Sequence, residues 1–247
     1  MRLDKYLADM GRGTRSELKS AIRRGNVSVD GKIVRDPGFH VSGEEAVLFC
    51  GQPVVYEEMV YYLMNKPAGV ISASEDPHTE TVVDLIAEPK RKDLFPVGRL
   101  DKDTEGLLII TNDGALAHRL LAPGKHVDKV YEAEIEGIVT EADVEIFAEG
   151  LKIDEDVFGQ NLKTSPSFTA LPAKLEILSV DEQKKTSRIR ITIREGKYHQ
   201  IKRMFHAVGK EVAYLKRISM GPITLDPSLA PGEYRYLTDA ERELLQV

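Results

Sequence analysis

Hydrophobic residues open the chain at helical spacing. Apolar positions recur every three or four residues over 3–10, and two glycines follow, which predicts a short amphipathic helix. Thr14 and Glu17 form a capping-box pattern before a second apolar stripe that ends at Gly25. Residues 27–34 then alternate around an Asp-Gly pair, the pattern of a hairpin. The first fifty residues are therefore predicted to form a helix–helix–hairpin unit.

The rest of the chain predicts a second, larger domain. Residues 51–59 contain Pro53 and are predicted to be a linker, and the apolar run from Val60 predicts a strand that stops at Pro67. Strand-like and helix-like stretches alternate beyond it, with strands expected at 107–111, 130–135, 173–180 and 188–193 and helices at 115–121, 141–149 and 198–208. We expect an α+β fold with a domain at 1–50 and a domain with a substantial sheet at 60–247.

Composition excludes several classes of protein. Apolar runs are far shorter than the ~18 to 20 residues that span a bilayer, and the N-terminus has no apolar signal segment, so we expect a cytoplasmic chain without a membrane partner. Cys50 is the single cysteine. It has no partner for an internal disulfide and cannot build a zinc site alone.

Charge is unevenly distributed, although its total is −6. Residues 1–35 hold nine Lys and Arg against four Asp and Glu, a net charge of +5. Residues 132–160 hold one against ten, a net charge of −9, and residues 194–217 hold seven against two, a net charge of +5. Two basic patches on either side of an acidic segment allow an acidic protein to bind a polyanion.

Residues 95–113, FPVGRLDKDTEGLLIITND, contain four acidic residues in and directly after the segment between two strand-like runs. Asp101, Asp103 and Glu105 match the first positions of a calcium-binding loop, but the twelfth position is Asn112, which cannot supply the bidentate carboxylate. A strand-like run also follows where a helix should leave the loop. The segment therefore predicts a carboxylate site without a metal.

The N-terminal unit resembles the small RNA-binding module named after the S-four protein of the small ribosomal subunit. The resemblance rests on RLDKYLA at 2–8, the helix entry at Arg15 and RGNVSVDG at 24–31. It implies a positive ridge that holds RNA phosphates without reading sequence. The residues expected to bind RNA there are Arg2, Lys5, Arg12, Arg15, Lys19, Arg23 and Arg24.

Nearly the whole chain resembles the pseudouridine synthases of the ribosomal small-subunit synthase A family. The motifs are GRLDKDTEGLLIITNDG at 98–114, NKPAGV at 65–70, KVYEAEI at 129–135, EGKYHQIKRMF at 195–205 and APGEYRYLT at 230–238. The resemblance implies a catalytic domain with a central, mostly antiparallel mixed sheet that isomerises a specific uridine of ribosomal RNA, with no cofactor. The partner is ribosomal RNA or an assembling subunit, and we expect a monomer.

The sequence YHQIKRMF at 198–205 resembles the small-subunit enzymes more than the large-subunit ones and favours RNA of the small ribosomal subunit as substrate. Two alternatives stay open: a synthase for large-subunit RNA, and a noncatalytic RNA-binding factor in ribosome assembly. The intact Gly-Arg-Leu-Asp motif, with Tyr131 and Lys202, argues against the noncatalytic alternative.

Family resemblance also implies the roles of individual residues. Asp101 is the catalytic carboxylate, Tyr131 holds the flipped base and handles a proton, and Lys202 is the cation that keeps Asp101 ionised. On a helix, Lys202 and Arg203 point about 100° apart, so only one of them can face Asp101. The remaining residues expected to contact RNA are Arg99, Lys129, His199, Gln200 and Arg203.

Overall fold

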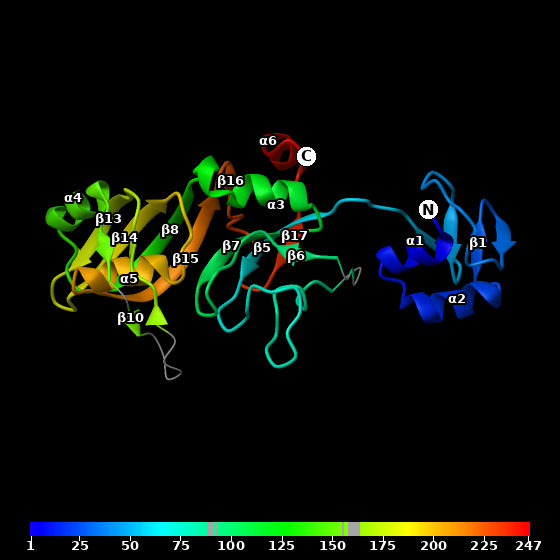
Figure 1. Cartoon of the computed structure of the whole chain (residues 1–247), viewed down its shortest axis with the longest axis horizontal. Helices are drawn as coiled ribbons and strands as arrows, with labels where there is room; N and C mark the ends of the chain where they lie inside the picture. The colour runs from blue at the N-terminus through cyan, green and yellow to red at the C-terminus, as the bar shows by residue number, and fades with distance from the viewer. Residues whose placement is uncertain (88–90, 92, 155, 158–163) are drawn as a thin grey trace.

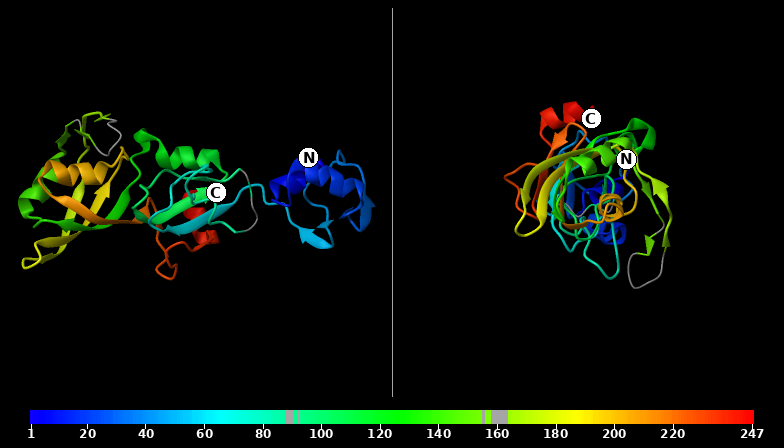
Figure 2. Two further views of the ribbon diagram at one scale, coloured as in Figure 1. Left: turned by 90° about the horizontal axis from the view of Figure 1, so that it is seen from below. Right: turned by 90° about the vertical axis from the view of Figure 1, so that its left-hand side faces the viewer.

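A computed structural model describes residues 1–87, 91, 93–154, 156–157 and 164–247 of the chain. Two units lie in a row along the long axis, and an extended segment joins the small N-terminal unit to the larger domain (Figures 1 and 2). No helix among these residues has both the length and the apolar character needed to cross a membrane.

The N-terminal unit contains the predicted helices and hairpin together with two further strands. Its elements are α1 (Leu3–Asp9), α2 (Arg15–Arg23), β1 (Val27–Val29), β2 (Lys32–Val34), β3 (Val47–Phe49) and β4 (Gln52–Val54), with the strands in the order β2-β1-β3-β4. The capping box between Thr14 and Glu17 forms as predicted. Strand β4 lies inside the segment 51–59 that was predicted to be a linker, so this part of the prediction is wrong. Pro53 is tolerated in β4 because this is an edge strand, where the missing N–H of proline costs no hydrogen bond between strands.

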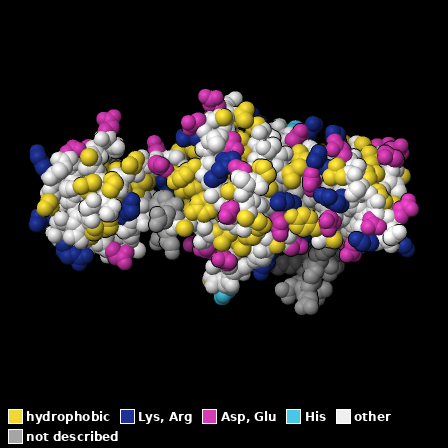
Figure 3. All heavy atoms as spheres, turned by 180° about the vertical axis from the view of Figure 1, so that it is seen from behind, with side chains coloured by type: hydrophobic (Ala, Val, Ile, Leu, Met, Phe, Trp, Pro, Cys, Tyr) yellow, Lys and Arg dark blue, Asp and Glu magenta, His cyan; other side chains and the backbone are white. Residues whose placement is uncertain are grey.

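Basic residues of this unit divide into paired and exposed groups. The Asp4 carboxylate is fully buried and accepts hydrogen bonds from Arg2 and Arg15, and the bonds from Arg2, followed by those from Arg15, lower its pKa. Lys5 pairs with Asp9 one turn along α1. Arg23 and Arg24 are exposed at the end of α2. Figure 3 shows dark blue Lys and Arg side chains on the outer edge of this unit.

One nine-stranded mixed sheet organises the larger domain. Its main path is β13-β14-β8-β15-β7-β5-β17, while β16 pairs with β15 and β6 with β7. Only the β15–β7 pair is parallel among the described pairings of this sheet. The strands are β5 (Tyr61–Lys66), β6 (Phe95–Pro96), β7 (Glu105–Thr111), β8 (Lys129–Glu136), β13 (Lys174–Asp181), β14 (Thr186–Ile193), β15 (Glu211–Met220), β16 (Ile223–Thr224) and β17 (Tyr234–Tyr236). The predicted α+β class and the mostly antiparallel mixed sheet are confirmed.

Helices cover the sheet where its strands carry apolar residues. α4 (Glu141–Glu149) and α5 (Gln200–Ala207) share one core cluster with β8, β13, β14 and β15, whereas α3 (Gly114–Leu121) and α6 (Asp239–Leu245) pack against β5 and β7. A third cluster covers the other face of β5 and β7, so these strands are buried on both faces and read as continuous apolar runs. The remaining short elements are η1 (Pro123–Lys125), β9 (Lys152–Ile153), β10 (Asp156–Val157), β11 (Thr164–Ser165) and β12 (Phe168–Thr169).

Strand β15, which the sequence analysis did not predict, joins the two halves of the sheet. Its pairing with β8 shifts register between Val212 and Tyr214 and again between Arg217 and Ser219, and these bulges break the alternation of apolar and polar residues. Gly106 makes its parallel contact with β7 possible. It has a φ of +101°, and a Cβ there would lie 2.2 Å from the carbonyl oxygen of Arg217.

Candidate active site

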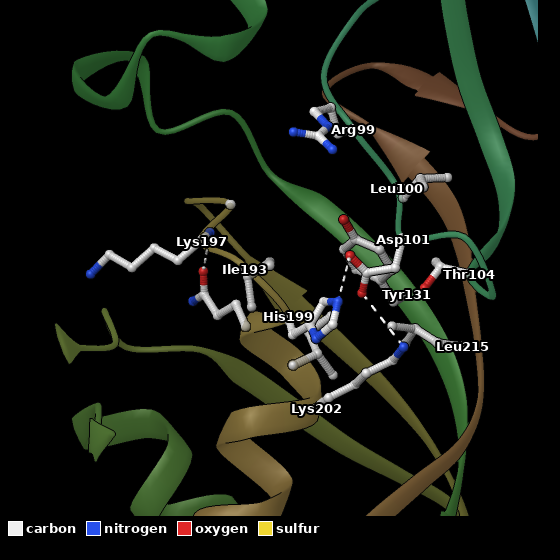
Figure 4. Close-up of a pocket in the computed structure, with 13 residues that line it drawn as sticks. Arg99, Leu100, Asp101, Thr104, Tyr131, Ile193, Lys197, His199, Lys202 and Leu215 are labelled. Carbon is white, nitrogen blue, oxygen red and sulfur yellow. Dashed lines mark hydrogen bonds and ion pairs between the residues drawn. The ribbon is translucent and has the colours of Figure 1, made fainter. Parts of the chain in front are cut away.

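A cleft beside the start of β8 brings the three predicted catalytic residues together. Asp101 enters from the loop before β7, Tyr131 from β8 and Lys202 from the first turn of α5 (Figure 4). The loop, the sheet and the helix are separated by long stretches of sequence, so only the folded chain forms this cleft. Before the structure, only the family resemblance indicated that these three residues act together.

The loop that carries Asp101 is held by the NKPAGV segment. The ammonium group of Lys66, at the end of β5, is fully buried and donates hydrogen bonds to the carbonyl oxygens of Pro67, Lys102 and Thr104. Ser72 Oγ accepts from the N–H of Leu100 and donates to its carbonyl oxygen. These bonds fix the backbone on both sides of Asp101. Burial lowers the pKa of Lys66 to about 8.

The Asp101 carboxylate lies near two nitrogen atoms without a close hydrogen bond to either. Lys202 Nζ is 3.6 Å from Oδ2, and His199 Nε2 is 3.7 Å from Oδ1. The closer partner of Lys202 is Asp103, at 2.6 and 2.8 Å. Burial would raise the pKa of Asp103, but the hydrogen bonds and charge of Lys202 outweigh it and lower the pKa. Asp103 therefore anchors the cation, and the Asp101 oxygens stay available to a substrate.

His199 begins α5 with a left-handed backbone, φ 49° and ψ 33°, and stacks on Tyr198 at 3.8 Å between ring centroids. Burial lowers the pKa of His199, more strongly than Asp101 raises it, so the ring is neutral at neutral pH. The contact between His199 and Asp101 is therefore not an ion pair under these conditions. Lys202 supplies the positive charge on this side of the carboxylate.

Two residues predicted to contact RNA, Gln200 and Arg203, are buried; Gln200 lines the cleft, whereas Arg203 does not. Gln200 donates to Glu195 and accepts from the backbone N–H of Lys197, which fixes the turn before α5. Arg203 donates to the carbonyl oxygens of Asp154 and Pro166 and lies over the ring of Phe168. They are 4% and 2% exposed. Because α5 turns about 100° per residue, Lys202 takes the side that faces Asp101 and Arg203 takes the core side.

Arg99 and Tyr131 line the cleft from the side opposite α5. Arg99 is exposed and precedes the catalytic loop, and Tyr131 is 7% exposed on the face of β8 that turns toward Asp101 (Figure 4). Lys129, two residues before Tyr131, does not line this cleft. It is buried and lines a neighbouring cavity with Tyr131 and Arg99.

The four acidic residues of 95–113 have separate tasks in the structure. Asp101 faces the cleft and Asp103 binds Lys202, while Glu105 accepts a hydrogen bond from the hydroxyl of Tyr214. Asp113 caps α3 by accepting from the N–H groups of Ala115 and Leu116. Within the described ranges, no group of three or more His, Cys, Asp or Glu is arranged to hold a metal ion.

Sequence reasoning missed the supporting residues Lys66, Ser72 and Asp103. Lys66 lies in the quoted NKPAGV motif and Asp103 in the quoted acidic segment, so both were visible, but neither pattern says which backbone or side chain is bound. Ser72 lies two residues beyond its motif and carries no local signal. Their importance follows from the loop contacts alone.

Comparisons with known proteins match both parts of the chain. Residues 60–207 match the family described as RNA pseudouridylate synthase, and residues 1–47 match the S4 domain. The RNA pseudouridine synthase YtzG of Bacillus subtilis, named as uncharacterised, is 49% identical, with 99% of this chain and 98% of the relative covered. Ribosomal small subunit pseudouridine synthase A of Escherichia coli is 38% identical, with 98% of each covered.

Similarity is equally high to a relative named for the other subunit. Ribosomal large subunit pseudouridine synthase B of Bacillus subtilis is 38% identical, with 99% of this chain and 95% of the relative covered. A crystal structure described as a pseudouridylate synthase aligns with a TM-score of 0.64 at 36% identity, covering 99% of both chains. The resemblance drawn from the motifs is thus confirmed, and this chain belongs to the RNA pseudouridylate synthase family, with an S4 domain at its N-terminus.

Proposed function

We propose that this chain isomerises one specific uridine of small-subunit ribosomal RNA, with Asp101 as the nucleophile. The supporting observation is the Asp101 carboxylate itself, which is partly open to solvent in the cleft while Asp103 takes the close bonds of Lys202. A carboxylate whose oxygens have no close hydrogen bond remains available to attack a substrate. A noncatalytic RNA-binding factor has no need of this arrangement.

The reaction rearranges bonds within one nucleotide. The bond between N1 of uracil and C1′ of ribose breaks, the base turns, and a bond from C5 to C1′ forms. The proton on C5 leaves, and N1 gains one, so no oxidant or cofactor enters the balance. Asp101 acts at the sugar or base as a nucleophile, or assists an unsaturated sugar intermediate. The ring of Tyr131 stacks on the flipped base, and its hydroxyl moves the C5 proton.

Sequence identity does not indicate which ribosomal subunit holds the substrate, because the relatives named for the small and the large subunit are equally similar to this chain. We assign the small subunit from the motif YHQIKRMF at 198–205. The exposed arginines of the N-terminal unit bind phosphates of the same RNA. We take the enzyme to work as a monomer.

The test maps pseudouridine in both ribosomal RNAs from cells with and without this gene. One small-subunit uridine is expected to stay unmodified without the gene and to be modified again when the wild-type gene is returned. Asp101→Asn should not restore it, and the purified variant should be at least about 1000-fold slower while it still binds RNA and folds. Asp103→Asn is the matched control and should lose no more than about 10-fold.

Loss of pseudouridine from large-subunit RNA alone would contradict the assignment of the subunit. Equal losses for Asp101→Asn and Asp103→Asn would contradict the assignment of the nucleophile. Complete modification in cells without the gene would contradict both.

A further inference from the structure

A second cavity of about 490 Å³ adjoins the cleft on the far side of Tyr131. Arg99, Tyr131 and Lys197 line both spaces, so the cavity and the cleft are neighbours. Figure 4 shows Tyr131 below Arg99 and Lys197 at the edge of the cleft. Leu121 contributes apolar surface, and Lys129 and Arg217 contribute positive charge.

Lys129, Tyr131 and Arg217 stand on one face of the sheet. Lys129 and Tyr131 are two residues apart on β8, and Arg217 on β15 is the register partner of Tyr131. Residues two apart on a strand, and residues paired across strands, share a face. The cationic groups of the cavity are therefore fixed by the sheet beside the tyrosine of the cleft.

The two cations are buried without an acidic partner. Lys129 is 8% exposed and Arg217 is 2% exposed, and neither forms an ion pair within the described residues. Arg217 Nε donates to the carbonyl oxygen of Leu107, but Nη2 has no hydrogen-bond partner in the part of the chain that the structure describes. Lys129 Nζ donates to the carbonyl oxygen of Val127.

Acidic residues near the cavity are occupied by other groups. Glu195 accepts from Gln200 and from the N–H of Leu171, and its second oxygen is 3.3 Å from Lys197 Nζ. Asp128 pairs with the exposed Arg194 at 2.7 Å. Burial, followed by the charge of Arg217, lowers the pKa of Lys129, while Asp128 raises it less. Among the described residues, Lys129 and Arg217 thus have no acidic side chain as a direct partner.

We propose that Lys129 and Arg217 bind a backbone phosphate next to the target uridine, and that the cavity seats the adjoining nucleotide. This rests on the proposed function, because it takes the ligand to be an RNA strand whose uridine lies at Asp101. A buried cation without a partner is costly, and an anion with several acceptor oxygens satisfies both the charge and the free N–H group of Arg217. An RNA phosphate is the anion that the substrate itself brings to this position.

The test measures binding to transcripts of both ribosomal RNAs at several salt concentrations, with Asp101→Asn in every protein so that no chemistry intervenes. Lys129→Met should weaken binding about 3-fold to 10-fold and lower the slope of log K against log salt by about 0.7, the value for one phosphate contact on a single strand. Lys216→Met is the matched control, since Lys216 precedes Arg217 on β15 and lines neither space. It should leave the slope unchanged.

A folded Lys129→Met protein with the wild-type slope on both RNAs overturns the proposal. If Arg217→Gln also folds, the double variant should lose no more slope than one phosphate accounts for, because both cations bind the same group. A loss of two contacts would overturn the shared phosphate. Because binding is measured on inactive proteins, this result stands apart from whether the enzyme modifies either RNA.

Discussion

The N-terminal unit and the catalytic cleft use positive charge in opposite ways. In the first, Arg12, Arg23 and Arg24 are exposed. Around the cleft, Lys66 and Arg217 are almost completely buried and donate to specific carbonyl oxygens. Exposed cations bind phosphates through a field that salt screens, so they are nearly interchangeable. Buried cations depend on their own partners, so the substitution of each one is expected to change a different property of the protein.

The largest effect on RNA binding should come from the exposed arginines of the N-terminal unit. Replacing Arg12, Arg23 and Arg24 together with Gln should weaken RNA binding about 100-fold and lower the salt slope by about 2, because three phosphate contacts disappear. Turnover at saturating RNA should change little. The measurement is a binding titration at several salt concentrations.

Three exposed cations at the far hairpin of the sheet provide the control. Lys184, Lys185 and Arg188 lie on or between β13 and β14, outside the cleft, and their replacement with Gln removes the same charge. If both triple variants lose the same affinity, binding follows total charge and the N-terminal unit has no special part in it.

The N-terminal unit and the cleft also differ in how far the sequence could predict them. Capping at Thr14, the Asp-Gly hairpin and the apolar period of α4 are local signals, and each of these elements forms where it was predicted. The predicted catalytic residues were found by family motifs, and the structure brings Asp101, Tyr131 and Lys202 into one cleft. Their roles stay predictions, because geometry alone does not measure turnover.

Burial of charged residues could not be predicted, because it depends on contacts far along the chain. Gln200 and Arg203 looked like surface groups of a basic helix. Gln200 instead binds the backbone of the turn before α5, and Arg203 binds the carbonyl oxygens of Asp154 and Pro166. Strand β15 was missed because its two bulges interrupt the period of two. The interdomain segment was misread in part because Pro53 is tolerated on the edge strand β4.

Lys202 combines features of the exposed and the buried cations, because it is partly exposed and also pairs with Asp103. Lys202→Met keeps much of the length of the side chain and removes its charge, so single turnover should slow about 30-fold. Lys102→Met is the control, because Lys102 is exposed and does not line the cleft. A rate that matches the wild type would transfer the role to Arg99.

Tyr131 tests whether the cleft needs a proton-handling group beside its charges. Tyr131→Phe keeps the ring that stacks on the base and removes the hydroxyl, so binding should persist while single turnover falls about 10-fold across neutral pH. Tyr198→Phe is the control, since Tyr198 is exposed and stacks on His199. Full activity in Tyr131→Phe would restrict this residue to stacking.

Lys66 should give the smallest effect, and it concerns stability rather than activity. Its pKa is about 8 in the folded protein and near 10.4 in an unfolded chain, so between these values the unfolded state binds more protons. The contribution of Lys66 to the free energy of unfolding therefore rises with pH above 8, by up to about 1.4 kcal/mol per pH unit. Well below pH 8 this contribution does not change with pH.

The difference in stability between the wild type and Lys66→Met isolates this group, whatever the substitution costs at neutral pH. From pH 8 to pH 9.5 the difference should move in favour of the wild type by about 1.5 kcal/mol, as measured by urea unfolding at each pH. The same difference for Lys102→Met, an exposed neighbour, should stay constant. If Lys66 gives a constant difference too, it titrates like an exposed lysine, and the contrast between buried and exposed cations does not hold for the residue that anchors the catalytic loop.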